Sequence, residues 1–127
     1  MNGNSAVIDS NVIIDASKGI VSIQEIVSKY DFLYISIISY IEVLGYQFKN
    51  IHEKSLVENI IENIPIVNID KEIADIAIEY RRIFKIKLPD ALILATSKSS
   101  GSDLLTRNVN DFIDIDDSIR IIKPKTL

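Results

Sequence analysis

The sequence predicts an α/β fold in which helices cover both faces of a parallel sheet. Short apolar runs alternate along the chain with segments of helical periodicity, and strands separated by helices pair in parallel. The 127 residues include only 4 glycines and 3 prolines, which are scattered and mark no linker or repeat. This length is close to that of one domain. We therefore expect a single domain over residues 1–127, with a parallel five-stranded sheet between helices in three layers.

The first half of the chain is predicted to alternate between strands and helices. The apolar run at Ser5–Asp9 is typical of a short buried strand, and Gly19 is a suitable end for the helix that follows it. Apolar residues at helical spacing after His52 predict an amphipathic helix. In chain order we expect a strand over Ser5–Asp9, helices over Asp9–Lys18 and Val21–Lys29, a strand over Phe32–Ser36, and helices over Ile37–Phe48 and His52–Asn63.

The second half continues the alternation and ends with two strands. Asp70 is a good N-cap for one helix, Pro89 suits the first turn of another, and Gly101 ends it. The expected elements are a strand over Pro65–Ile69, a helix from Asp70 to Phe84, a helix over Asp90–Ser100, and strands over Leu104–Thr106 and Ile119–Ile122. In parallel sheets of this kind, ligands bind beyond the carboxyl ends of the strands.

The composition excludes several classes of protein. Cysteine is absent, which excludes a disulfide framework, a thiol nucleophile and cysteine metal sites, and His52 is the only histidine. No apolar run approaches the ~20 residues of a membrane span, and the first residues lack the pattern of a signal peptide. We expect a soluble, cytoplasmic protein. The net charge of −4 means that any nucleic acid must be held by a local basic patch or by bound cations.

Three acidic residues stand in unusually apolar surroundings. Asp9 closes the first strand, where it also suits the N-cap of the next helix, and Asn11 lies where it can hydrogen-bond Asp9. Glu42 interrupts an apolar helix, so it lies either on a narrow solvent face or beside a cation. Asp90 begins a helix that is apolar nearly all round, where the helix dipole also favours an acid. The fold would bring all three to one edge of the sheet.

A fourth polar cluster follows the fourth expected strand. Thr106, Arg107, Asn108 and Asp111 lie just beyond it, at the same edge as the three acids. Carboxylates gathered there repel one another unless cations lie between them, and an all-oxygen site suits Mg²⁺ or Mn²⁺. Such a centre activates water for attack on a phosphodiester and needs no histidine base.

Four segments, in this order and spacing, carry a resemblance to a known family. They are V-I-D-S-N-V-I-I-D, S-Y-I-E-V-L-G, L-P-D-A-L-I-L-A-T and L-L-T-R-N-V-N-D-F, and together they extend over nearly the whole chain. The sequence resembles the PIN-domain ribonucleases, most closely the VapC-type toxins of toxin–antitoxin pairs. The resemblance implies a Mg²⁺- or Mn²⁺-dependent endoribonuclease that cleaves RNA. It also implies a homodimer, and a small antitoxin that occupies the active groove.

The resemblance also assigns roles to individual positions. Asp9, Glu42 and Asp90 match the family's metal-binding acids, and Asn108 stands where many members have an aspartate. Asp111 is then expected to supply the missing charge, while Asn108 orients water or substrate. The implied catalytic residues are Asp9, Glu42, Asp90, Asn108 and Asp111, the metal ligands are Asp9, Glu42, Asp90 and Asp111, and the substrate contacts are Asn11, Thr106, Arg107, Arg82 and Lys85.

Two other groups of charges are less clear from the sequence. Arg81, Arg82, Lys85 and Lys87 form a basic cluster that either caps a helix end in solvent or contacts the RNA backbone beside the site. Asp15 is expected on the surface of its helix. Asp114, Asp116 and Asp117 are expected in a solvated loop.

Two alternative functions stay open at this point. A haloacid-dehalogenase-type phosphatase would use Asp9 as its nucleophile, but that family requires a second aspartate where this chain has Asn11. A PIN-like module that binds a partner without cleaving RNA is the other alternative. Cleavage of RNA that depends on a divalent metal would separate the three.

Overall fold

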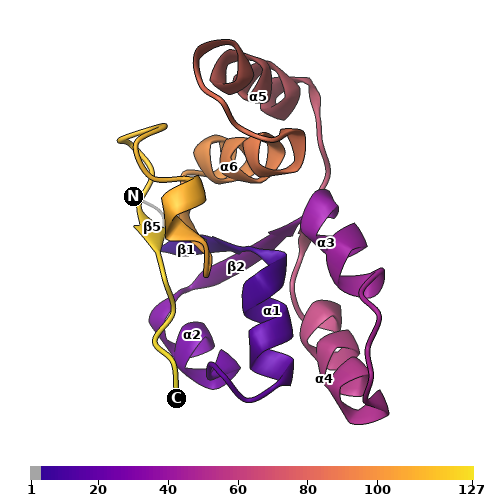
Figure 1. Cartoon of the computed structure of the whole chain (residues 1–127). Coiled ribbons are helices and arrows are strands. Elements are labelled where there is room, and N and C mark those ends of the chain that lie inside the picture. Colours follow the sequence, from indigo (N-terminus) through magenta and orange to yellow (C-terminus); the bar gives the residue numbers. More distant parts are fainter. Residues whose placement is uncertain (1–3) are drawn as a thin grey trace.

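Five parallel strands form the centre of the molecule, in the order β3-β2-β1-β4-β5 (Figure 1). The computed structural model describes residues 4–127, and residues 1–3, part of the segment considered above for a signal peptide, lie outside it. The strands are β1 (Ser5–Ile8), β2 (Phe32–Ser36), β3 (Ile66–Val67), β4 (Asp103–Leu105) and β5 (Ile121–Ile122). The parallel five-stranded sheet predicted from the sequence is confirmed.

Helices cover both faces of this sheet, as expected for parallel strands joined by crossovers. In Figure 1, α5 and α6 lie on one face and α1, α2 and α4 on the other, with α3 at the side. The bounds are α1 (Ser10–Ser17), α2 (Ile23–Lys29), α3 (Ile37–Leu44), α4 (Ile51–Glu62), α5 (Lys71–Ile83) and α6 (Leu88–Ser100). Among residues 4–127, no helix has the length and apolar character needed to cross a membrane.

The apolar residues of β1 are divided between two cores, one on each face of the sheet. Ala6 and Ile8 pack with α1, α2 and α4, while Val7 packs with α5 and α6. Leu104 and Leu105 of β4 divide in the same way. Since successive side chains of a strand point to opposite faces, a continuous apolar run is what a sheet buried on both sides requires.

The helix ends follow the local sequence closely. Asp70 accepts a hydrogen bond from the backbone N–H of Ile73 (2.9 Å), as an N-cap does. Gly101 ends α6 with φ of 65°, in the left-handed region that favours glycine. Both boundaries were predicted.

Several details differ from the prediction, among them the start of α6, which lies at Leu88 rather than at Asp90. The helix α3 ends at Leu44 rather than Phe48, because Gly45 ends it with a bond from its N–H to the Ile41 carbonyl (2.8 Å). A Cβ on Gly45 would lie 2.9 Å from that carbonyl oxygen, so the close approach depends on glycine. The strands β3 and β5 are shorter than expected. A short 3₁₀ helix, η1 (Val109–Asp111), follows β4 where only a polar loop was expected.

Candidate active site

Asp9 lies at the carboxyl end of β1 and begins α1. Its side chain is only 5% exposed. Asp9 Oδ1 accepts a bond from the N–H of Ser10 (2.8 Å), which makes Asp9 the N-cap of α1. Asp9 Oδ2 accepts from the Thr106 hydroxyl (2.8 Å) and from Asn11 Nδ2 (3.2 Å). The predicted bond between Asn11 and Asp9 is confirmed. Burial raises the pKa of Asp9, while these donors oppose the rise.

Thr106 and Asn11 join Asp9 to the loop after β4. Thr106 is fully buried, with its hydroxyl turned to Asp9 rather than to the surface. Its oxygen also accepts a bond from the N–H of Asn108 (3.1 Å). Asn11 Oδ1 accepts from the N–H of Arg107 (3.0 Å). The loop is therefore held to the start of α1 by the bonds of Thr106 to Asp9 and of Arg107 to Asn11, and Asp9 is fixed in one orientation.

Glu42 reaches the same region from α3. Its Oε1 accepts a bond from the Ser10 hydroxyl (3.1 Å), and Ser10 follows Asp9 directly. Partial burial raises the pKa of Glu42, and the nearby charge of Asp9 raises it further. Sequence reasoning did not single out Ser10, although its place inside the motif D-S-N could have indicated a supporting role.

Asp90 lies in the first turn of α6 and is half-buried. Burial raises its pKa to about 6, and the charges of Asp9, Asp111 and Glu42 add to the rise, with Lys87 opposing it. No side-chain hydrogen bond to Asp90 is found within residues 4–127. The structure thus brings four acids from distant parts of the chain into mutual repulsion.

The two late polar residues differ in their surroundings. The exposed Asp111 lies in η1, and its N–H donates to the Asn108 carbonyl (3.0 Å). Asn108 is also exposed, and its backbone N–H is bound to Thr106. The charge of Asp111 acts on Asp90, as described above, so Asp111 belongs to the acidic cluster. We call Asp9, Glu42, Asp90 and Asp111 the acidic cluster below.

The donor set of the acidic cluster fits a hard divalent cation. The cluster offers carboxylate oxygens, and the repulsion between these carboxylates is what a bound cation would relieve. Within residues 4–127, no three acidic or histidine side chains form a ready-made metal cage. Such an arrangement suits Mg²⁺ or Mn²⁺ with several retained waters rather than an ion enclosed by protein.

A protein-family model for the PIN domain matches residues 6–118. The chain belongs to the PIN-domain family. This assignment agrees with the predicted resemblance and with the α/β fold described above. No curated protein sequence matches the chain significantly.

Solved structures with the same fold include several toxin–antitoxin complexes. A chain of a toxin–antitoxin complex from Klebsiella pneumoniae has 31% identity and a TM-score of 0.77, over 96% of this chain and 99% of that chain. VapBC2 from Rickettsia felis, bound to a promoter DNA fragment, has 18% identity and a TM-score of 0.78, over 95% and 99%. DNA-bound VapBC from Salmonella typhimurium has 21% identity and a TM-score of 0.75, over 94% and 98%.

Two predictions about individual acids of this PIN domain are wrong. Asp15 is not on the helix surface, since its carboxylate is buried and pairs with Arg107 (2.7 Å). Its position four residues after Asn11 places it on the same face of α1, a signal that was available in the sequence. Asp116 is not simply solvated, since it accepts bonds from Tyr80 (2.6 Å) and from Ser118.

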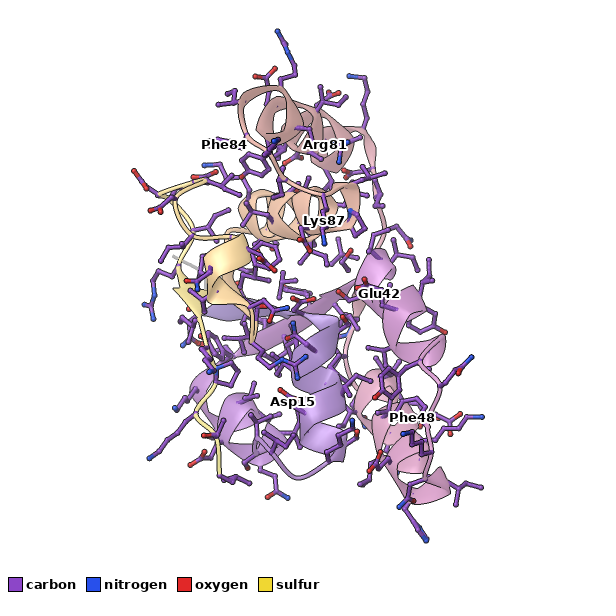
Figure 2. All side chains as sticks on the ribbon, in the orientation of Figure 1. Asp15, Glu42, Phe48, Arg81, Phe84 and Lys87 are labelled. Carbon is purple, nitrogen blue, oxygen red and sulfur yellow. The ribbon has the colours of Figure 1, made fainter. Side chains whose placement is uncertain are left out.

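Of the four residues of the basic cluster, Lys87 is the one whose charge acts on Asp90. Figure 2 shows Lys87 beside α6, and its charge is the one that opposes the raised pKa of Asp90. Arg81 donates to the Ile86 carbonyl (3.1 Å), and Arg82 pairs with Glu79 on the surface (3.0 Å). No hydrogen bond or ion pair joins Arg82 or Lys85 to the acidic cluster. The sequence analysis treated the four basic residues alike and did not distinguish Lys87 from the other three.

Proposed function

We propose that this PIN domain is a metal-dependent endoribonuclease and the toxin component of a type II toxin–antitoxin pair. The observation that carries the proposal is the acidic cluster, in which partial burial, together with the charges of Asp9, Asp111 and Glu42, raises the pKa of Asp90 to about 6. A cluster of uncompensated acids at the carboxyl edge of a parallel sheet is suited to a cation and a phosphodiester. The likeness to a chain of a toxin–antitoxin complex, at 31% identity, supports the biological role.

Different residues of the site would bind the metal, position the ligands and orient the substrate. We assign Asp9, Glu42, Asp90 and Asp111 to holding Mg²⁺ or Mn²⁺, with Asp9 and Asp90 as the direct or water-bridged ligands. When bound, a divalent cation activates water and stabilises the negative charge that develops on the phosphodiester. Thr106 and Asn11 hold the Asp9 carboxylate in place through its Oδ2 atom. The exposed Asn108 orients water or substrate beside them.

The direct test is cleavage of RNA by the purified protein. We expect cleavage with Mg²⁺ or Mn²⁺, none with a chelator, and none for Asp90→Asn. Asp90 is a cleaner target than Asp9, because Asp9→Asn would also disturb the bonds to Thr106 and Asn11. A folded protein that binds RNA or a partner without cleaving would instead support the non-catalytic alternative. Membership of the PIN family favours the nuclease over the phosphatase.

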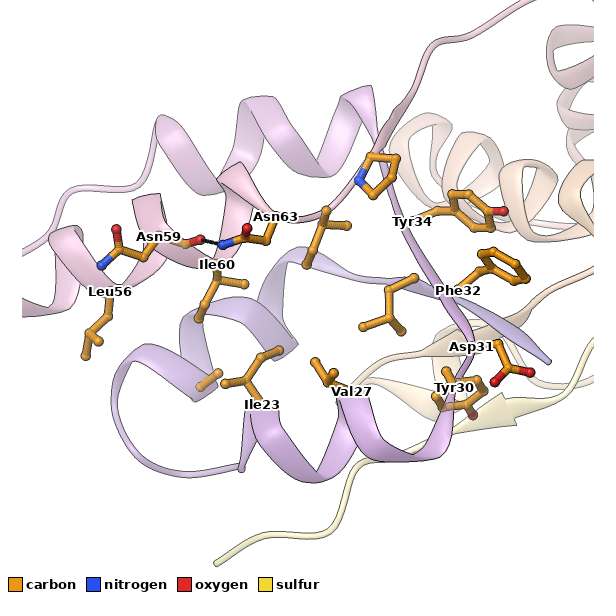
Figure 3. A pocket seen from close by; sticks show the side chains of 14 residues that line it. Ile23, Val27, Tyr30, Asp31, Phe32, Tyr34, Leu56, Asn59, Ile60 and Asn63 are labelled. Atoms are coloured by element: carbon orange, nitrogen blue, oxygen red, sulfur yellow. Dashed lines mark hydrogen bonds between the residues drawn. The ribbon is translucent and has the colours of Figure 1, made fainter. Parts of the chain in front are cut away.

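We further propose that the antitoxin docks in an apolar groove away from the acidic cluster. The groove has a volume of about 550 Å³ and lies between α2 and α4, over the starts of β2 and β3 (Figure 3). Val27, Phe32 and Leu56 line it and are exposed. Exposed apolar surface of this kind typically marks a binding site for a protein segment. None of the proposed catalytic residues lines this groove.

A further inference from the structure

An ion pair beside the acidic cluster has no part in the proposed chemistry. Arg107 Nη1 lies 2.7 Å from Asp15 Oδ1. The Asp15 side chain is 6% exposed, whereas that of Arg107 is 51% exposed. Removing the partner of a buried carboxylate is strongly destabilising, because the carboxylate is left buried without its ion pair. Asp15 therefore holds the Nη1 end of the Arg107 guanidinium against α1.

Two hydrogen bonds, one from its backbone and one from its side chain, join Arg107 to α1. Its backbone N–H donates to Asn11 Oδ1 (3.0 Å), and its guanidinium binds Asp15 four residues further along the helix. Residues four apart lie on the same face of a helix, so the two contacts run along one side of α1. Together they fix both the backbone and the side chain of Arg107.

The neighbours of Arg107 depend on this attachment. Thr106, just before it, donates to Asp9 Oδ2 (2.8 Å), and Asn108, just after it, donates its N–H to Thr106 (3.1 Å). The same loop continues into η1, which carries Asp111. Any shift of Arg107 along α1 would therefore move a hydrogen-bond partner of Asp9 and the position of Asp111 together.

We propose that Asp15 and Arg107 are positioning residues, whose ion pair holds the loop of residues 106–111 against α1 and so sets the geometry of the acidic cluster. The proposal rests on the proposed nuclease function. It assigns Arg107 a role different from the phosphate contact implied by the family resemblance. Removing outer contacts of this kind commonly lowers metal affinity or activity by about 10- to 100-fold.

The test compares Asp15→Asn, Arg107→Gln, the double variant and Arg107→Lys. Each single variant should weaken Mn²⁺ binding, measured by calorimetry without RNA, by about tenfold and lower kcat by a similar factor. The double variant should be no worse than either single one, because all three break the same pair. Arg107→Lys should restore part of both losses, since it keeps the charge but not the fork of donors. KM and the salt dependence of RNA binding should not change.

A matched control is the exposed pair of Lys71 and Asp75 on α5, which lie 2.8 Å apart. Lys71→Gln and Asp75→Asn make the same changes of charge far from the loop and should leave Mn²⁺ affinity and kcat unchanged. The NMR signals of the Asn11 side-chain amide give a readout that needs neither metal nor RNA. They should shift in the Asp15 and Arg107 variants but not in the control variants.

Two results would overturn the proposal. If Arg107→Gln flattens the salt dependence of RNA binding by about 0.7 while Asp15→Asn does not, Arg107 contacts a phosphate instead. If the single variants lower only the melting temperature, with Mn²⁺ affinity, kcat and the Asn11 signals unchanged, the pair merely stabilises the fold. The nuclease function and the positioning role can also fail separately. If the wild-type protein cleaves no RNA but the variants bind Mn²⁺ more weakly than it does, the nuclease function is refuted and the positioning role is supported.

Discussion

At the scale of single residues, Asp90 is the acid whose ionisation costs the fold most. Its pKa rises from 3.8 to about 6 in the folded protein, through burial and through the charges of Asp9, Asp111 and Glu42. Between those two pH values the folded state binds more protons than the unfolded state, so stability falls as pH rises. The ionised carboxylate of Asp90 therefore destabilises the fold, and such perturbed carboxylates are common at functional sites.

From this we predict the effect of Asp90→Asn on the metal-free protein. At pH 7.5 the variant removes a repelled charge and should melt about 2–4 °C higher than the wild type. At pH 5.0 the wild-type carboxyl is largely protonated, so the gain should nearly vanish. Thermal melts in a chelator, at both pH values, measure the difference. Asp117→Asn, at an exposed acid outside the cluster, is the control, and an equal gain at both pH values would contradict the prediction.

The roles of Asp111 and Asn108 can be distinguished by the Mg²⁺ concentration that variants at each position need for cleavage. If Asp111 supplies the charge that Asn108 lacks, Asp111→Asn should raise the Mg²⁺ concentration for half-maximal cleavage by about tenfold. Asn108→Ala removes no charge and should raise it less. Both side chains are exposed, so neither change should disturb packing. Equal shifts, or a larger one for Asn108→Ala, would argue against Asp111 as a ligand.

At the scale of secondary structure, local sequence patterns predicted most elements because the forces that set them are local. Asp70 and Gly101 end helices through bonds within a few residues, so their roles are visible in the sequence. The buried strand β1 was predicted from apolarity alone, since both of its faces meet helices. The early end of α3 at Gly45 was missed, although the sequence offers the same signal there as at Gly101, a glycine at the end of a helix.

The candidate site was predictable in its residue types but not in its contacts. The order of the four motifs indicated which acids meet, and the structure does couple Asp9, Glu42 and Asp111 to Asp90. The spacing of Asn11 and Asp15 indicates that they share a face of α1, but Arg107 lies 92 residues from Asp15 in the chain, so no local pattern identifies it as the partner. The partners of a polar side chain depend on the packing of several elements, and that information is spread over the sequence.

The next prediction concerns the end of α5 and its connection to α6, and asks how an acidic protein holds RNA. Arg82→Ala with Lys85→Ala should weaken binding of all RNA sequences alike. Each lost phosphate contact should also flatten the plot of log affinity against log salt by about 0.7 for a single strand. The pairing of Arg82 with Glu79 is exposed and weak, so it would not prevent such a contact.

The measurement uses the Asp90→Asn protein, so that no cleavage interferes, and a series of salt concentrations. Lys71→Ala, on the same helix as Arg82 and with a side chain that is 89% exposed, serves as the control for a change of charge elsewhere. An unchanged salt dependence in the double variant would mean that Arg82 and Lys85 only face solvent or a partner subunit.

At the scale of the whole molecule, the exposed apolar surface of α5 and α6 predicts a homodimer. Ile78, Ile83 and Leu88 are exposed there. In a twofold dimer a surface meets its own copy, so these apolar side chains would be buried against their equivalents in the partner. Ile78→Asp should convert the dimer into a monomer in light scattering. Ile113→Asp, at an exposed isoleucine after η1, should not.

The last prediction follows from the separation of the apolar groove from the acidic cluster. The groove lies over the starts of β2 and β3, whereas the acids lie beyond the carboxyl ends of the strands. Antitoxin docking and RNA cleavage should therefore be separable by mutation. Leu56 lines the groove and is 49% exposed, so a lysine there adds a charge to the apolar surface without disturbing the core.

We expect Leu56→Lys to weaken binding of the antitoxin, co-purified from the neighbouring reading frame, by about 30-fold, or about 2 kcal/mol. RNA cleavage by the free variant should equal that of the wild type, because the acidic cluster is untouched. Ile51→Lys is the matched control, since Ile51 begins the same helix, is 75% exposed and does not line the groove. If Leu56→Lys binds the antitoxin as tightly as Ile51→Lys does, the antitoxin docks elsewhere. The active groove would then be its principal contact, as the family resemblance implies.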